Sequence, residues 1–235
     1  MNTVQIVLII VLAVVVAALL FFVIKNMIMP KRVDAIPHFL KQGKSQNAIK
    51  IAKQIIAKDP NNCLAHYYLG KAYILENKSE LAIIEYKFVD EHALFGAELN
   101  EINFRKEFSP LLLKYKHQNE ALKNFLLLTK LEPRNAENYF NVGLIYENNN
   151  RFDLALGFMQ KAAYLDNKHA KAHAEIGMMF YRTKQYSEAK KEIDIAIKLS
   201  PETYSSYYYL GKILKDAKDI AGALRAFEKA QRDSD

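Results

Sequence analysis

The sequence has no tryptophan and little cysteine, proline or glycine: one cysteine, six prolines and eight glycines among 235 residues. The single cysteine, Cys63, excludes an internal disulfide, and a lone thiol suits a reducing compartment. Motifs of common phosphate, dinucleotide and zinc sites are also missing, because there is no P-loop, G-x-G-x-x-G, H-E-x-x-H or C-x-x-C. We therefore expect a protein that is not an enzyme and holds no cofactor.

An apolar run, Val4 to Ile24, is the first feature that the sequence does contain, and Gln5 is its only polar residue. As a helix it would be about 31 Å long, enough to cross the apolar core of a bilayer, which is about 30 Å thick. A secretory signal peptide is the alternative, but the run is too long and no basic residue precedes it. We expect a transmembrane anchor over residues 1–28, which meets the membrane through residues 4–24.

The charges that flank the run predict its orientation. No lysine or arginine precedes it, whereas several follow: Lys25, Lys31, Arg32, Lys41 and Lys44. Because basic flanks usually stay in the cytoplasm, we expect a single-pass protein with its remaining residues cytoplasmic. These lysines either serve only as topology signals or also contact anionic headgroups. The abundance of Lys, Asn and Ile favours a bacterial source, and hence the bacterial inner membrane.

A 34-residue period runs through the rest of the chain. Gly143, Gly177 and Gly211 are 34 residues apart, and small and aromatic residues keep the same spacing around them. Alanine and proline also recur twelve residues apart, in the pairs Ala48 and Pro60, Ala121 and Pro133, and Ala189 and Pro201. A period of this length is typical of a repeated helix-turn-helix unit that buries its apolar face against its neighbours.

These slots resemble those of the tetratricopeptide repeat (TPR) family, over about residues 29–235. The resemblance implies an all-α fold, in which an N-terminal transmembrane helix is followed by a right-handed TPR superhelix of about six repeats. We place the repeats at about residues 29–62, 63–96, 102–135, 136–169, 170–203 and 204–235. One anchor ahead of such an array resembles N-terminally membrane-anchored bacterial TPR proteins.

The third repeat departs from the pattern. Five extra residues, 97–101, precede it, and its glycine slot holds Ser109, which Pro110 follows. Serine is a good N-cap and proline suits the first position of a helix. We therefore expect a helix over residues 98–108 that breaks or kinks before Pro110.

The resemblance also implies a binding groove, because in this family the concave face of the first helices holds a peptide or a partner helix. The residues at the corresponding slots are Tyr67, Lys71, Ile74, Phe140, Asn141, Leu144, Lys171, Met178, Tyr181, Tyr208 and Lys212. This mixture of aromatic, aliphatic and basic side chains suits an extended or helical peptide. The alternative is a solvated face with no fixed ligand.

Some TPR domains clamp the carboxylate at the end of a peptide with basic and amide side chains from three consecutive repeats. Lys106, Asn141 and Lys171 occupy matching slots here. Pro110 replaces the second member of the set, and Glu175 reverses the charge of the last. The pattern therefore argues against a carboxylate clamp.

Metal and nucleic-acid sites are not expected either. His169 and His173 are four residues apart and could share a helix face, as metal ligands do. However, His173 occupies a packing slot that holds Tyr139 and Tyr207 in other repeats. The formal charge of +7 gathers near the anchor, while later helices mix both signs, which is the pattern of a solvated surface.

Together, these features predict a membrane-tethered TPR scaffold that binds a protein or peptide partner in its groove at the cytoplasmic face. The alternative is a periplasmic or outward-facing TPR assembly factor for a pilus, secretion or envelope complex. The last repeat also predicts an apolar edge at Ile213, Leu214 and Phe227. That edge is either a homo-oligomer contact or tolerated exposure.

Overall fold

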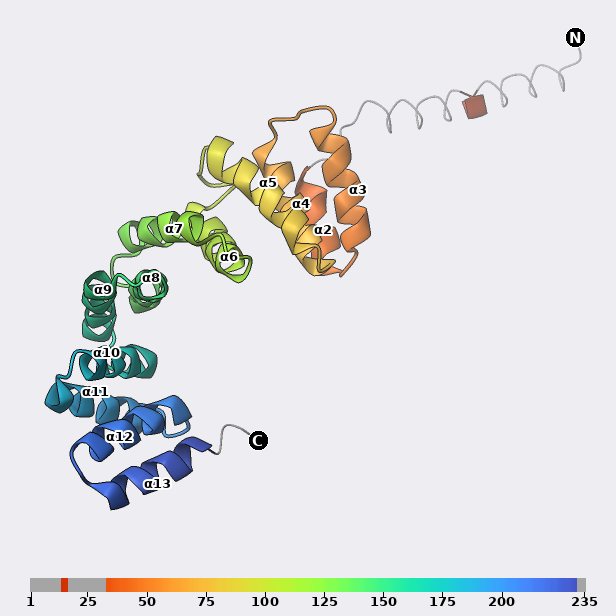
Figure 1. Ribbon diagram of the computed structural model, residues 1–235. Coiled ribbons are helices and arrows are strands. Elements are labelled where there is room, and N and C mark those ends of the chain that lie inside the picture. Colours follow the sequence, from red (N-terminus) through yellow and green to blue (C-terminus); the bar gives the residue numbers. More distant parts are fainter. Residues whose placement is uncertain (1–13, 17–32, 232–235) are drawn as a thin grey trace, which may run out of the picture. The chain divides into compact units, whose positions relative to one another are not determined.

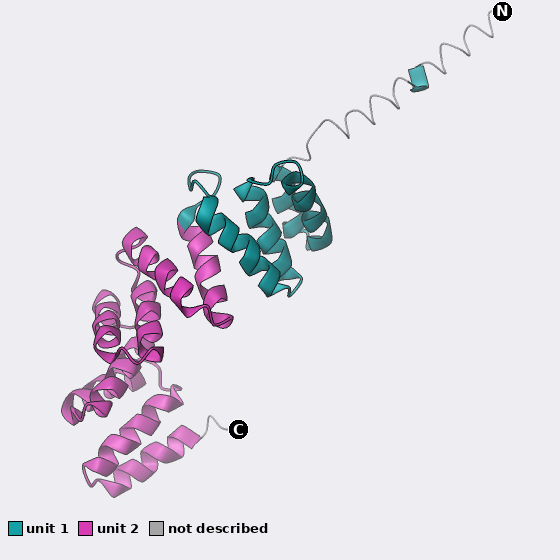
Figure 2. Cartoon of the chain, turned by 45° about the horizontal axis from the view of Figure 1, so that its top comes forward, with its two compact units in different colours: residues 1–101 teal, residues 102–235 magenta. Residues whose placement is uncertain are grey.

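The computed structural model describes residues 14–16 and 33–231, and all regular structure in these ranges is helical (Figure 1). The chain divides into two compact units, Met1–Glu101 and Ile102–Asp235 (Figure 2). The all-α prediction is confirmed for the described residues. Among those residues, no helix has the length and apolar character that a membrane crossing needs. The predicted anchor, residues 4–24, lies outside the described residues except for 14–16.

Unit 1 consists of short helices that pair in chain order. They are the 3₁₀ turn η1 (Val33–Ala35) and the α-helices α2 (Ile36–Lys41), α3 (Ser45–Ile56), α4 (Cys63–Leu75) and α5 (Ser79–His92). Each of α2, α3 and α4 packs on its successor. Helix α4 begins where the Asn62 side chain accepts a hydrogen bond from the Ala65 N–H at 3.0 Å, which satisfies a donor that the helix itself leaves unpaired.

Unit 2 repeats this arrangement over a longer stretch. Its helices are α6 (Glu101–Lys114), α7 (Gln118–Leu131), α8 (Ala136–Asn148), α9 (Phe152–Leu165), α10 (Ala170–Arg182), α11 (Tyr186–Leu199), α12 (Tyr204–Asp216) and α13 (Ile220–Gln231). From α7 onward every helix packs against the next. Ala155, Met159, Ala172 and Ile176 form one continuous core between α9 and α10. The unit is therefore held by contacts between neighbours, as a repeat array requires.

The turn inside each hairpin carries one residue in the left-handed region. These residues are Gly43, Asn77, Lys116, Asn150, Lys184 and Lys218. Their spacing is 34 residues, except for 39 between Asn77 and Lys116, where the five extra residues lie. Left-handed backbone is strained for residues other than glycine, so its recurrence at one position shows the same turn built repeatedly from different sequences.

The recurring glycines mark the closest approach of two helices. A Cβ added to Gly143 would lie 2.7 Å from Met159 Cγ, and one added to Gly177 would lie 2.7 Å from Ile193 Cγ1. At Gly211 the obstacle is the Phe227 ring at 2.6 Å. In each case the blocking residue follows the glycine by 16 positions, so the three glycines are equivalent. The helices pack this closely only because no side chain separates them.

Of the break or kink predicted before Pro110 in the third repeat, the break is wrong. Helix α6 runs from Glu101 through Ser109 and Pro110 to Lys114 without interruption. The Ser109 hydroxyl donates a hydrogen bond to the Arg105 carbonyl oxygen at 2.6 Å, so it does not cap a new helix. Phe104, Phe108 and Leu112 are almost completely buried. Their burial stabilises the helix across the proline, against its local preference.

The predicted apolar edge also differs. Ile213 is buried, Leu214 is partly buried, and Phe227 is partly buried with its ring against Gly211. The exposed apolar residues of α13 are instead Ile220 and Leu224, at 58% and 59% exposure. The homo-oligomer contact itself stays a prediction.

Candidate binding face of unit 2

Three helices of unit 2 are joined by polar contacts along one face. Arg182 Nη1 on α10 donates to Glu147 Oε1 on α8 at 3.2 Å. The Tyr181 hydroxyl on α10 donates to Asp216 Oδ2 on α12 at 2.8 Å. These contacts bring α8, α10 and α12, the first helices of three successive hairpins, side by side. We call this surface the first-helix face; its residues are Glu147, Lys171, Glu175, Met178, Tyr181, Arg182, Tyr208, Lys212 and Asp216.

A cluster of tyrosines surrounds one lysine on this face. Lys212 Nζ lies 4.8 Å from the ring centre of Tyr181, 5.5 Å from that of Tyr208 and 5.6 Å from that of Tyr209. A cation this close to aromatic faces is attracted by the negative potential of the rings. Tyr208 is 48% exposed, so the cluster is accessible to a partner. Tyr209 was not among the residues predicted from the sequence, although it shares a repeat slot with Asn141 and Glu175.

Tyr181 anchors this cluster. Burial and then the hydrogen bond to Asp216 raise the pKa of Tyr181 to about 12. The phenol therefore keeps its proton at neutral pH and remains the donor in its bond to Asp216. Met178 is partly exposed one turn earlier on the same helix, and Lys171 is exposed at its start. Five of the predicted groove residues thus lie on α10 and α12 with accessible surface.

The predicted residues of α8 are less available. Phe140 is only 4% exposed, and its ring packs on His169 with the ring centres 4.8 Å apart. Asn141 donates through Nδ2 to the Glu137 carbonyl oxygen at 2.8 Å. Leu144 packs against the core cluster between α9 and α10. Phe140 is therefore a packing residue in this structure.

The three predicted residues of unit 1 lie on α4. Tyr67 is 8% exposed, and its ring stacks on Tyr86 with the centres 5.8 Å apart. Lys71 Nζ donates to the Tyr67 hydroxyl at 3.2 Å and lies 5.1 Å from the centre of its ring. Ile74 is 36% exposed. Tyr67 thus resembles Phe140 in its burial, while Ile74 and Lys71 reach the surface.

Two carboxyl groups of the first-helix face lie near one arginine. Burial raises the pKa of Glu147, and the Arg182 charge opposes this shift. Burial and the Glu147 charge raise the pKa of Glu175 to about 7, again against the opposing effect of Arg182. Glu175 Oε2 is sealed from solvent and has no hydrogen-bond partner. From the sequence, Glu175 was noted only because its negative charge occupies a position that is basic in a carboxylate clamp.

The remaining clamp positions are engaged or open. Lys106 Nζ is 2.7 Å from Glu132 Oε1, so its charge is already paired. Lys171 is exposed, and Asn141 is bonded to its own helix. Together with Glu175, these contacts give no convergent set of donors for a carboxylate.

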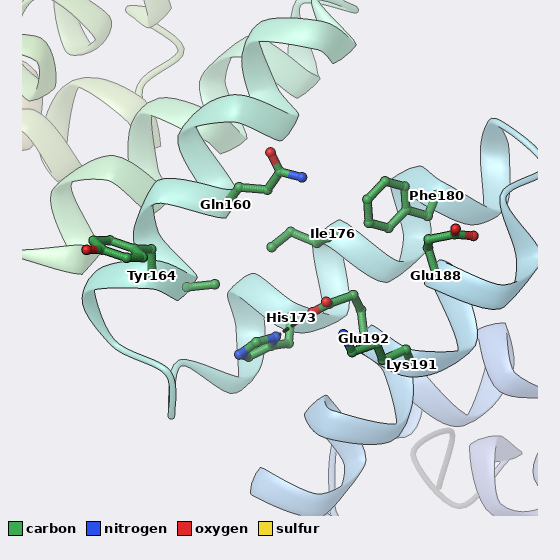
Figure 3. Close-up of a pocket in the computed structure, with 9 residues that line it drawn as sticks. Gln160, Tyr164, His173, Ile176, Phe180, Glu188, Lys191 and Glu192 are labelled. Carbon is green, nitrogen blue, oxygen red and sulfur yellow. Dashed lines mark hydrogen bonds and ion pairs between the residues drawn. The ribbon is translucent and has the colours of Figure 1, made fainter.

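The two histidines considered as metal ligands face different partners. His169 Nδ1 accepts from the Ala172 N–H at 3.2 Å, while His173 Nδ1 lies 2.6 Å from Glu192 Oε2. Among the residues that the structure describes, no group of three or more potential ligands could hold a metal ion. His173 also borders a cavity of about 400 Å³ between α9 and α11 (Figure 3). Its lining includes Gln160, Tyr164, Phe180 and Lys191, and none of the predicted groove residues lines it.

The fold defines the class: in the described residues the protein is an α-helical repeat protein whose hairpins recur every 34 residues, apart from one interval of 39. The kind of repeat is given by the protein-family models that match the chain. Models described as tetratricopeptide repeat match residues 51–84, 136–169 and 174–235. The chain therefore carries tetratricopeptide repeats, as the glycine slots predicted.

Two curated proteins are similar to this chain in sequence. The BBSome complex member BBS4 homolog of Drosophila melanogaster is 24% identical over 201 residues, which are 82% of this chain and 39% of that protein. The Hsp70-Hsp90 organising protein of Plasmodium falciparum (isolate 3D7) is 26% identical over 167 residues, 68% of this chain and 27% of that protein. The chain thus spans well under half the length of these two relatives.

Among solved structures, YrrB, a TPR protein with an unusual peptide-binding site, is similar to this chain with a TM-score of 0.65. Its sequence identity is 17%, over 74% of this chain and 87% of that one. At this identity the likeness shows the fold alone.

Proposed function

We propose that this protein is a membrane-tethered TPR scaffold that binds a protein or peptide partner on the first helices of its repeats. The observation that carries the proposal is the accessible cluster of Tyr181, Tyr208 and Tyr209 around Lys212. Tyrosine supplies large contact area at low cost in conformational entropy, and lysine adds a charge that orients a ligand. Helical grooves that capture peptides use such a mixture. The names of YrrB and of the Hsp70-Hsp90 organising protein are consistent with this function.

The tether rests on the apolar run over residues 4–24 and on the basic residues that follow it. With this charge asymmetry the array would face the cytoplasm. Protease treatment of intact cells that express a C-terminally tagged chain is the test. We expect the tag to be protected until the membrane is permeabilised. Cleavage in intact cells would reject this orientation and favour the outward-facing assembly factor.

The binding face can be tested once a partner is captured from solubilised membranes and purified. We expect Tyr208→Glu combined with Lys212→Glu to weaken that partner's binding at least about tenfold, because the pair removes an aromatic anchor and reverses a charge. Tyr164→Glu is a matched control, since Tyr164 is 80% exposed on α9, outside the first helices. Equal binding by the double variant and the control would reject the first-helix face.

A further inference from the structure

An unpaired carboxylate oxygen lies within the first-helix face. Glu175 Oε2 is shielded from solvent, and no donor reaches it. The positive charge of Arg182 acts on Glu175, but Arg182 Nη1 is bonded to Glu147 Oε1, and its Nη2 lies 3.8 Å from Met178 Sδ. The Phe152 ring also holds the guanidinium, at 5.6 Å from the ring centre. Arg182 is therefore committed to other groups.

The local charges do not balance. Two carboxyl groups, one from α8 and one from α10, share a single arginine, so one negative charge is uncompensated when both are ionised. A buried polar atom without a partner is uncommon in native proteins and costs free energy that a ligand can recover. A donor with a positive charge would supply both the missing hydrogen bond and the missing charge.

We propose that Glu175, with Glu147, forms a subsite for the charged end of a lysine or arginine side chain of the partner, whose apolar stem lies along Met178. Because Glu175 Oε2 is shielded in the free chain, the Glu175 side chain must turn outward to meet that charged end. This proposal rests on the proposed function and adds the chemistry of one ligand position to it. An anionic group is disfavoured there by two carboxylates. A neutral donor could form the hydrogen bond to Glu175 Oε2, but it would leave the excess negative charge of the two carboxylates uncompensated.

The raised pKa values of both carboxyl groups support the subsite. Burial dominates both shifts, and Glu147 further raises the pKa of Glu175, to about 7. The charged groups that act on Glu175 are Glu147 from α8 and Arg182 from its own helix. A bound cation favours the ionised carboxylate, so binding must lower the pKa of Glu175.

The direct test uses n-butylguanidinium, with its neutral isostere n-butylurea as the matched probe. The full chain, labelled at its methionine methyl groups and held in an uncharged detergent, is titrated at pH 8. We expect butylguanidinium to shift the Met178 methyl resonance in a saturable way and butylurea to leave it unchanged. Equal shifts from both probes, or none from either, would overturn the proposal.

Two variants separate charge from shape. Glu175→Gln keeps the volume of the side chain but removes its charge, and we expect it to weaken butylguanidinium binding about tenfold, equivalent to about 1.4 kcal/mol. Glu188→Gln is the control, because Glu188 is exposed on α11, outside the first-helix face. Unchanged affinity in Glu175→Gln, with its helical circular dichroism intact, would contradict the subsite.

A third measurement distinguishes this proposal from the proposed function. Once a partner peptide is known, each lysine or arginine in it is replaced in turn by norleucine or citrulline. One such position should lose its contribution to affinity in the Glu175→Gln protein but not in the Glu188→Gln protein. If no position does so while Tyr208→Glu with Lys212→Glu still weakens binding at least about tenfold, the subsite fails and the scaffold function stands.

Discussion

Two hairpins of unit 2, α6/α7 and α10/α11, fill the same repeat slots with different chemistry. In α6/α7 the slots 19 residues apart hold Arg105 and Asn124, bonded at 2.5 Å. In α10/α11 the equivalent slots hold His173 and Glu192, at 2.6 Å. These repeat slots therefore fix the position at which two helices meet, whereas the residue types that make the contact there can differ between hairpins. In α10/α11 the contact leaves His173 Nε2 buried without a hydrogen-bond partner.

The glycine slot differs in the same way. Gly177 in α10 lies against Ile193, whereas Ser109 in α6 is fully buried and bonds to its own helix. The α10/α11 helices approach closely because Gly177 has no side chain. In α6/α7 the small Ser109 side chain occupies this position, and its hydroxyl is hydrogen-bonded within α6. We therefore predict that the stability of the α6/α7 hairpin depends most on its buried polar pair. The stability of α10/α11 should depend most on having glycine at position 177.

The largest expected effect comes from breaking the polar pair of α6/α7. Asn124→Leu should destabilise unit 2 by about 3 kcal/mol, because the buried Arg105 guanidinium loses the amide oxygen that accepts its hydrogen bond, and hydrogen bonds to buried charged groups are among the strongest. Denaturant unfolding followed by circular dichroism measures this change. A loss below about 1 kcal/mol would show that the other contacts of Arg105 compensate.

The second largest effect is expected from a comparison of two glycines in unit 2, Gly177 and Gly157, each replaced by alanine. Gly177→Ala should destabilise by about 2 kcal/mol, because the new methyl group would lie 2.7 Å from Ile193 Cγ1 and 3.1 Å from the Ala189 carbonyl oxygen. Gly157→Ala in α9 meets nothing within 4 Å and should stabilise by about 0.5 to 1 kcal/mol. Opposite signs of the two changes in the unfolding midpoint are the expected result, and equal signs would contradict the close-approach role.

The carboxyl group of Glu175 on α10 gives unit 2 a pH-dependent stability. The pKa of Glu175 is raised to about 7 in the folded chain from an ordinary value of 4.5. The folded state therefore binds more protons between these values, and stability falls as pH rises from 4.5 to 7, then stays level. The full shift equals about 3 kcal/mol, and partial exposure reduces the expected fall to about 1.5 kcal/mol. Glu175→Gln should remove it, as unfolding at pH 5 and pH 8 would measure; an unchanged difference would assign the dependence elsewhere.

The smallest effect sharpens the role of Ser109. Ser109→Ala loses the hydrogen bond to the Arg105 carbonyl oxygen, and we expect a loss of about 1 kcal/mol. The hydroxyl would instead be a helix cap if the break predicted from the sequence existed. An increase in helicity or stability on this substitution would show that Ser109 opposes the continuous helix.

Much of the fold was predictable because the spacing of small residues reports the spacing of helices. Gly143, Gly177 and Gly211 are equivalent in the structure, as their 34-residue interval indicated. The prediction failed at Ser109 and Pro110, where local preferences favour a helix start. There the burial of Phe104 and Phe108 outweighs the local cost of the proline, and no local rule contains that information.

The candidate site was predictable only as a set of slots. Of the residues at these slots, Tyr208, Lys212 and Met178 have accessible surface, whereas Tyr67 and Phe140 are buried. A slot number gives the direction of a side chain from its helix axis, not the depth of the neighbours around it. Tyr209 and Glu175 gained their significance from residues on other helices, which a single-helix pattern does not describe.

The sequence by itself determined that the chain forms repeated helical hairpins, because periodicity and the demand for close packing act on residues near one another in the chain. It also determined the apolar run and its basic flank. Only the tertiary structure decided which polar groups pair, which aromatic side chains stay exposed and which carboxylate is left without a donor. These outcomes depend on distances between side chains of different helices, and burial alters their energies in ways that residue identity alone does not reveal.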